Sequence, residues 1–134
     1  MSEESDRHPS LPAVCESYLA IENRLDQLYT LSAKAEELLA AKHGWFTLTR
    51  VQRRTLPAAQ VYYDLEDEVE ELQGASSQLV IDLVDMPARS LDEAVAKLEV
   101  VARVIEPADY PYAHAVLAGA IKDLRCLLAQ GQSG

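Results

Sequence analysis

The sequence predicts an all-α protein, and three of its properties carry that prediction. Of its 134 residues, 49% are hydrophobic and five are glycine, a composition that favours packed helices over disorder. Apolar residues recur at steps of three and four over long stretches, which is the period of a helix packed on one side. Proline, glycine and serine residues stand where these stretches begin and end.

The helix that the sequence defines most clearly is expected over residues 90–105. Ser90 and Glu93 have the spacing of a capping box, in which the hydroxyl accepts from a free backbone N–H and the carboxylate reaches back. Pro107 stops the helix because proline lacks an N–H and disfavours helical geometry in the residue before it. Apolar residues fall on two sides of this helix, so we expect the other helices to pack around it.

A long helix is expected upstream, over residues 11–43. Ser10 suits its first turn and Gly44 its end. Its apolar side comprises Val14, Tyr18, Ile21, Leu25, Leu28, Ala35 and Leu39. The polar residues 1–10 before it are expected to form a flexible tail.

A second long helix is expected over residues 56–85, capped by Thr55 and with Pro57 in its first turn. Its apolar period keeps one phase through Gly74, which favours a single helix over the alternative of a turn at that residue. The intervening residues 44–55 are expected to form a connection with about one helical turn.

The last helix is expected over residues 109–129, closed by Gly131, with a short tail over residues 131–134. Short connections make neighbouring helices antiparallel. We therefore predict a four-helix bundle within a single domain of residues 11–130. One long hairpin comprises about 11–43 and 56–85, and one short hairpin comprises about 90–105 and 109–129.

The difference in length between the two hairpins predicts an exposed apolar stripe, because helices of about 15 to 18 residues cannot cover helices of about 30. A second copy is the simplest cover, so we predict a homodimer. The alternative is that residues 44–55 fold back over the stripe, which also includes Leu31 and Val61. The predicted interface residues are Leu38, Leu39, Trp45, Phe46, Arg50, Arg53, Arg54, Tyr62 and Leu65.

Three of these residues, Arg50, Arg53 and Arg54, form the one basic cluster in the sequence. Beside Trp45 and Phe46 at the tip of the long hairpin, they would suit a protein partner with an acidic surface. The alternative is that they form salt bridges with the acidic residues 64–71 of a neighbouring copy. Both alternatives lead to a non-enzymatic interaction module that self-associates through its long hairpin.

An enzymatic alternative comes from carboxylates on the second helix. Paired carboxylates hold Mg²⁺ above a nucleotide in helical pyrophosphohydrolases, and Glu68, Glu71, Asp82 and Asp85 imitate that pairing. On a helical wheel most of them lie opposite the apolar side, so a solvated acidic face is the better interpretation. The sequence contains no pairing typical of a nucleophile, and we expect no metal and no cofactor.

The net charge of −10 argues against direct nucleic-acid binding, although an acidic surface that mimics nucleic acid is a further idea that rests on charge alone. No apolar run approaches the length of a membrane span, and the acidic start is unlike a signal peptide, so we expect a cytoplasmic protein. Cys15 and Cys126 are expected to stay reduced, with a disulfide between them as the alternative.

The phrase Pro-Ala-Arg-Ser-Leu-Asp-Glu-Ala-Val-Ala-Lys-Leu at residues 87–98 precedes a polar linker and a leucine-rich helix containing Asp123 and Leu124. This last third of the chain resembles a group of small uncharacterised helical proteins of alpha-proteobacteria, some apparently linked to prophages. In that group the phrase usually reads Pro-Ala-Thr-Thr-Leu-Ala-Gly-Leu-Ala-Ala-Lys, so Glu93 replaces the usual glycine. The resemblance implies a bacterial helical protein and brings no known activity.

Overall fold

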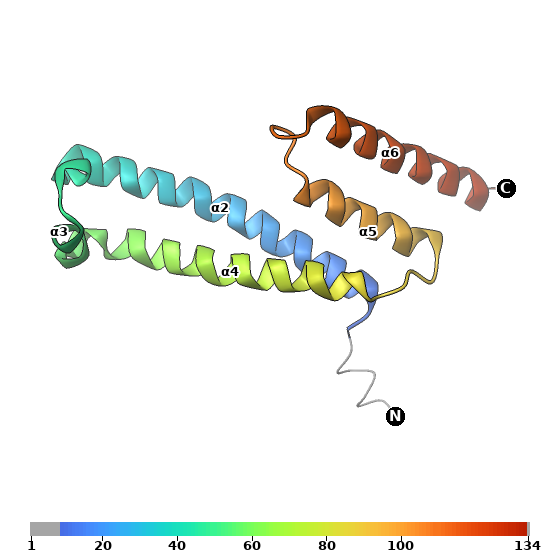
Figure 1. The fold of residues 1–134 in the computed structure, drawn as a ribbon, viewed down its shortest axis with the longest axis horizontal. Helices are drawn as coiled ribbons and strands as arrows, with labels where there is room; N and C mark the ends of the chain where they lie inside the picture. The colour runs from blue at the N-terminus through green and yellow to red at the C-terminus, as the bar shows by residue number, and fades with distance from the viewer. Residues whose placement is uncertain (1–8, 134) are drawn as a thin grey trace, which may run out of the picture. The chain divides into compact units, whose positions relative to one another are not determined.

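The computed structural model describes residues 9–133, and this range contains helices and no β-strand (Figure 1). This confirms the predicted all-α class. The elements, in chain order, are α2 (Leu11–His43), the 3₁₀ turn η1 (Trp45–Thr47), α3 (Arg50–Thr55), the 3₁₀ turn η2 (Pro57–Ala59), α4 (Gln60–Val84), α5 (Leu91–Val104) and α6 (Pro111–Ser133). Most of the predicted N-terminal tail, residues 1–8, lies outside the described residues.

The first long helix agrees with the prediction in extent, and the second differs from it mainly at its start. α2 has the predicted bounds and ends where Gly44 adopts a left-handed conformation with φ 60°. α4 runs without a break through Gly74, which confirms a single helix. It begins at Gln60 rather than near residue 56, because Pro57 opens a separate 3₁₀ turn.

The segment between α2 and α4 is more structured than predicted. Thr49 caps α3 through a complete capping box, because the Thr49 hydroxyl accepts from the Gln52 N–H (3.1 Å) and the Gln52 amide oxygen accepts from the Thr49 N–H (2.8 Å). The prediction that Thr55 caps the second long helix is wrong. Thr55 is the last residue of α3, and its hydroxyl donates to the Val51 carbonyl oxygen at 3.0 Å.

The ends of α5 and α6 correct two further details. Ser90 caps α5 as predicted, accepting from the Glu93 N–H at 3.1 Å, but the Glu93 carboxylate accepts from the Arg89 N–H and not from that of Ser90. The prediction that Gly131 closes the last helix is wrong, since α6 continues to Ser133. Gly131 does not have a positive φ, whereas Gly44 does. A glycine in helical geometry costs only about 1 kcal/mol relative to alanine, so it need not end a helix.

The chain divides into two compact units, each built from parts of α2 and α4. We call residues 20–77 the hairpin unit, and the described residues 9–19 with 78–133 the terminal unit. In the hairpin unit, α2 and α4 run side by side in opposite directions (Figure 1). Hydrogen bonds join them near both ends: Ser76 donates to Glu22, and Tyr62 donates to Glu36. The arrangement of all helices as one four-helix bundle stays a prediction.

The core of the hairpin unit consists of two apolar clusters and two buried serines. Leu25, Leu28 and Val69 form one cluster, against which Ile21, Leu65 and Leu72 pack. Leu39, Trp45 and Ala59 form the other, together with the half-buried Ala40, Leu48, Leu56, Tyr62 and Tyr63. The buried hydroxyls of Ser32 and Ser76 donate to the carboxylates of Glu66 and Glu22 on the opposite helix.

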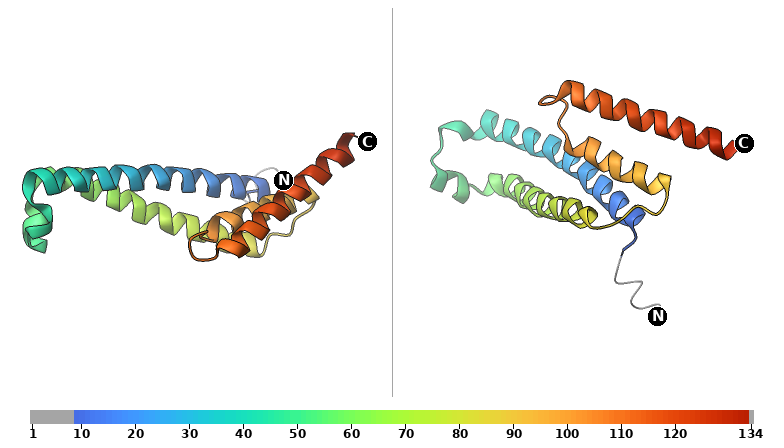
Figure 2. Two further views of the ribbon diagram at one scale, coloured as in Figure 1. Left: turned by 90° about the horizontal axis from the view of Figure 1, so that it is seen from above. Right: turned by 45° about the vertical axis from the view of Figure 1, so that its right-hand side comes forward.

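The terminal unit packs α5 against the start of α2 and the end of α4. Its buried cluster comprises Leu11, Val14, Cys15, Tyr18, Leu83 and Val100. Val95 and Val100 lie on different sides of α5, and each is 1% exposed. Figure 2 shows α6 beside α5, and the Arg125 Nε atom donates to the Glu99 carboxylate at 2.7 Å between the two helices. None of the helices described is long and apolar enough to cross a membrane.

Candidate interaction surface

The segment between α2 and α4 folds onto the ends of these helices, and Trp45 anchors it there. Trp45 is 2% exposed, and its ring centroid lies 5.4 Å from that of Tyr62 and 6.1 Å from that of Tyr63. The left-handed Gly44 turns the chain just before it, a conformation that glycine adopts without strain. The expectation that Trp45 lies exposed at the tip is therefore wrong.

The predicted apolar stripe is correspondingly smaller than the sequence suggests. Leu39 is 5% exposed, while Tyr62 and Leu65 are half-buried within the two clusters of the hairpin unit. Leu39 and Tyr62 are covered by the segment between α2 and α4, which agrees with the alternative that residues 44–55 fold back over the stripe. Leu38 and Phe46 remain 52% and 67% exposed.

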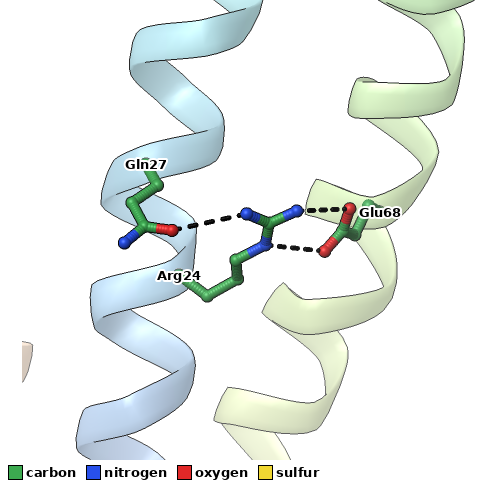
Figure 3. Close-up of polar contacts among 3 residues, drawn as sticks. All are labelled: Arg24, Gln27 and Glu68. Carbon is green, nitrogen blue, oxygen red and sulfur yellow. Dashed lines mark hydrogen bonds and ion pairs between the residues drawn. The ribbon is translucent and has the colours of Figure 1, made fainter.

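The exposed part of the stripe lies on one side of the hairpin unit. Leu31 and Leu38 follow Arg24 at steps of seven residues, so the three share one side of α2. Val61 precedes Glu68 by seven residues on α4. Arg24 binds Glu68 across the two helices (Figure 3), so Leu31, Leu38 and Val61 flank this ion pair. We call these three residues, 46–65% exposed, the apolar side.

Each of the three tip arginines has a different environment. The Arg53 Nε atom donates to the Trp45 carbonyl oxygen at 3.0 Å, and its guanidinium carbon lies 4.8 Å from the Trp45 ring centroid. The guanidinium carbon of Arg54 lies 4.1 Å from the centroid of the Tyr63 ring, a cation–π geometry. Arg50 is exposed. Within residues 9–133, no carboxylate forms an ion pair with any of these arginines.

Two adjoining hollows, each of about 560 Å³, lie on the surface that carries these arginines. Arg54, Tyr62 and Tyr63 line both of them. The first hollow is completed by Trp45, Leu48, Arg50 and Arg53. The second extends along α4, where it is completed by Glu66, Asp67, Val69, Glu70 and Gln73, together with Tyr29 of α2.

This surface is basic at one end and acidic at the other. Tyr63, Asp67 and Glu70 are spaced by four and three residues, so they share a side of α4. We call the surface formed by Arg50, Arg53, Arg54, Tyr62, Tyr63, Asp67 and Glu70 the dipolar face. The sequence predicted residues 64–71 of a neighbouring copy as alternative partners of the arginines, but it neither separated Asp67 and Glu70 from the other carboxylates there nor pointed to Tyr63, although the helical spacing of the three residues was readable.

Tyr62 of the dipolar face is a neutral group at neutral pH. Burial raises the pKa of the Tyr62 phenol above its ordinary value, and the nearby carboxylates of Glu66 and Glu36 raise it further. The Tyr62 hydroxyl donates to the Glu36 carboxylate at 3.3 Å. Tyr62 therefore contributes a hydrogen bond and apolar ring area rather than a reactive phenolate.

The carboxylates of the enzymatic alternative are not presented as a metal site. Arg24 donates from Nε to Glu68 Oε2 at 2.9 Å and from Nη2 to Oε1 at 3.2 Å, so both oxygens of this carboxylate are occupied (Figure 3). The same hydrogen bonds lower the pKa of Glu68. In the described part of the chain, no three His, Cys, Asp or Glu side chains are placed to hold a metal ion. Glu68 and Glu71 belong to the hairpin unit, while Asp82 and Asp85 belong to the terminal unit.

The two cysteines are both free, so the disulfide alternative is not formed. Cys15 is buried in the cluster of the terminal unit, and Cys126 is exposed on α6. Burial is the main cause that raises the pKa of the Cys15 thiol. The Cys15 side chain is therefore a protonated, apolar part of the core rather than a nucleophile.

Comparison of the chain with protein-family models, curated proteins and solved structures finds no match. A function must therefore be inferred from the residues of the two units themselves. The hairpin unit offers the more specific surface, because charges of both signs that have no ion-pair partner among residues 9–133 lie on one face of it.

Proposed function

We propose that this protein is a non-enzymatic helical interaction module that self-associates as a homodimer through its long helical hairpin, with the tip of the hairpin contacting an acidic protein surface. The observation that carries the proposal is the composition of residues 46–54, where two exposed apolar side chains accompany three arginines that have no carboxylate partner in the described part of the chain. Phe46 is 67% exposed and Val51 is 72% exposed.

The exposure of these side chains is not required by the fold of the hairpin unit. Leu28 and Ala59 are fully buried and Trp45 nearly so, which means that the core is filled without Phe46 or Val51. Full burial of one such side chain contributes about 1.5–3 kcal/mol. A two-fold contact buries each residue in both copies, and this symmetry is the commonest among oligomers.

The bacterial cytoplasm is the setting that we propose. Two free cysteines suit a reducing compartment, and the acidic composition suits a freely diffusing protein. The phrase at residues 87–98 supports a bacterial origin through its resemblance to small alpha-proteobacterial proteins.

Light scattering after size-exclusion chromatography tests self-association, from about 1 µM to about 100 µM protein. We expect a mass of twice the 14.8 kDa of one chain. Phe46→Gln with Val51→Gln should raise the dissociation constant about tenfold or more, since each 1.4 kcal/mol changes it tenfold. A single-chain mass at every concentration contradicts the proposal.

A matched control replaces two apolar residues of similar exposure on α6. Val116 is 73% exposed and Leu127 is 62% exposed, and both belong to the terminal unit. Val116→Gln with Leu127→Gln should leave the mass unchanged. If the control variant dissociates and the tip variant does not, the association runs through the terminal unit instead.

A further inference from the structure

We infer that two copies associate in antiparallel orientation, with the arginines at the tip of each copy lying on Asp67 and Glu70 of the other. The inference rests on the proposed self-association and names the face that makes it. It specifies the dipolar face, and it identifies the acidic surface that the tip contacts as that of a second copy of the chain.

The basic end of the dipolar face is arranged for an anion that the unit itself does not provide. Three arginines within five residues repel one another unless negative charge is nearby. Stacking on Tyr63 and Trp45 fixes two of the guanidinium groups in place. A guanidinium held in place loses less conformational entropy when it binds a carboxylate.

The acidic end of the dipolar face carries two carboxylates that have no cationic partner among the described residues. Other carboxylates on this part of α4 are already bound: Asp64 accepts from Gln60, Glu66 from Ser32 and Glu68 from Arg24. Asp67 and Glu70 have neither a hydrogen bond nor an ion pair to another residue of the described chain. They are one helical turn apart on the same side, so they form a pair of acceptors.

The order of these groups makes the face complementary to itself. In a two-fold contact every pairing occurs twice. If the basic end of one copy meets the acidic end of the other, the acidic end of the first copy also meets the basic end of the second. Tyr62 and Tyr63 lie between the two charged ends. Along α4, Asp67 and Glu70 lie about 6 Å and 10 Å beyond Tyr63, at 1.5 Å per residue. A two-fold axis crossing α4 beside Tyr63 therefore brings the arginines of one copy over the carboxylates of the other.

The apolar side is a weaker candidate for the contact surface, and a nucleic acid is a weaker candidate for the partner. The charges that flank the apolar side, Arg24 and Glu68, already neutralise each other, and three half-exposed apolar residues are ordinary on a protein surface. A nucleic acid would meet the arginines but also the carboxylates beside them, on a chain of net charge −10. A second copy satisfies both ends at once.

Charge exchange between two variants tests the contact. Arg50→Glu with Arg54→Glu gives an acidic variant, and Asp67→Lys with Glu70→Lys gives a basic one. Each alone should have a dissociation constant at least about 100-fold higher than the natural sequence, because like charges then face each other. An equimolar mixture of the two should restore the dimer mass. Arg53 is left unchanged because it binds the Trp45 carbonyl oxygen.

Two controls accompany the exchange. Asp123→Lys changes charge on α6, in the terminal unit and outside the dipolar face, and should leave the dimer intact. Circular dichroism and the melting temperature establish that each variant is folded. The single variant Arg50→Glu keeps both ring stacks, so it remains informative if replacing Arg54 disturbs the tip.

The outcomes separate the inference from the proposed function. A natural chain that is monomeric throughout overturns both. A dimer that withstands either charge variant, or a mixture that does not reassociate, overturns the inference and leaves self-association standing. If Leu31→Gln with Leu38→Gln dissociates such a dimer, the contact lies on the apolar side.

Discussion

Replacing Trp45 with alanine should be among the most destabilising single changes in the hairpin unit. Trp45 is 2% exposed and connects the segment between α2 and α4 to Leu39, Ala59 and the rings of Tyr62 and Tyr63. Truncation would empty this position, and the surrounding side chains could fill it only in part. The neighbouring Phe46, which is 67% exposed, provides a matched control.

The magnitude follows from the buried area. A tryptophan buried to this degree removes about 200 Å² from water, which at about 25 cal/mol per Å² corresponds to ~5 kcal/mol. Loss of two edge contacts with tyrosines adds to the cost, while retention of a methyl group and local relaxation reduce it. We expect Trp45→Ala to lower the free energy of unfolding by about 3–5 kcal/mol. Phe46→Ala should lower it by under about 1 kcal/mol.

Urea unfolding followed by circular dichroism measures both variants, since Trp45 is the single tryptophan and its fluorescence is lost on substitution. In the unsubstituted chain, the same fluorophore should be shielded from acrylamide until unfolding begins. A loss below about 1 kcal/mol for Trp45→Ala, or equal losses for the two variants, would refute the burial argument.

Three further predictions concern caps, thiols and pH. Ser90→Ala should lower the free energy of unfolding by about 1 kcal/mol in urea titrations, whereas Ser90→Thr should largely retain it. Iodoacetamide at neutral pH should modify Cys126 well before Cys15, as peptide mass spectrometry would record, because Cys15 is buried and its pKa is raised; equal rates would contradict its placement. Arg24 lowers the pKa of Glu68, so their pair stabilises the fold above the carboxyl's ordinary value of 4.5 and this stabilisation is lost as pH falls through the lowered pKa. Glu68→Gln should therefore melt below the unsubstituted chain at neutral pH and approach it in acid, and a constant difference across pH would be the contrary result.

The features that the sequence predicts well depend on neighbouring residues along the chain. Ser90 caps α5 with its own hydroxyl, and Gly44 ends α2 through its own φ angle. The continuity of α4 through Gly74 was also predictable, because the apolar residues on both sides of Gly74 keep one helical phase and a single glycine does not need to end a helix. The capping box of Thr49 and Gln52 was also readable from their spacing of three residues, although the prediction for this segment was only about one helical turn, with Thr55 as the cap of the next helix.

The features that the sequence could not predict depend on distant contacts. Nothing in the residues next to Trp45 and Phe46 shows that the first is buried and the second exposed. That difference arises only when the connecting segment meets Leu39 and Tyr62. The dipolar face has the same origin, since the spacing of Tyr63, Asp67 and Glu70 was visible while the approach of Arg54 to Tyr63 required the fold.

The buried serines of the hairpin unit fix the alignment of its two helices. Apolar side chains alone specify the alignment of two helices weakly, because leucine and valine recur at similar intervals on both helices, whereas a buried polar residue specifies it. A shift of one helix along the other would leave the Ser32 and Ser76 hydroxyls without their glutamates, at about 1–3 kcal/mol each. Alanine at both positions should give a hairpin that samples several alignments. A homologous hairpin whose work requires its helices to slide would be expected to lack this pair of serines.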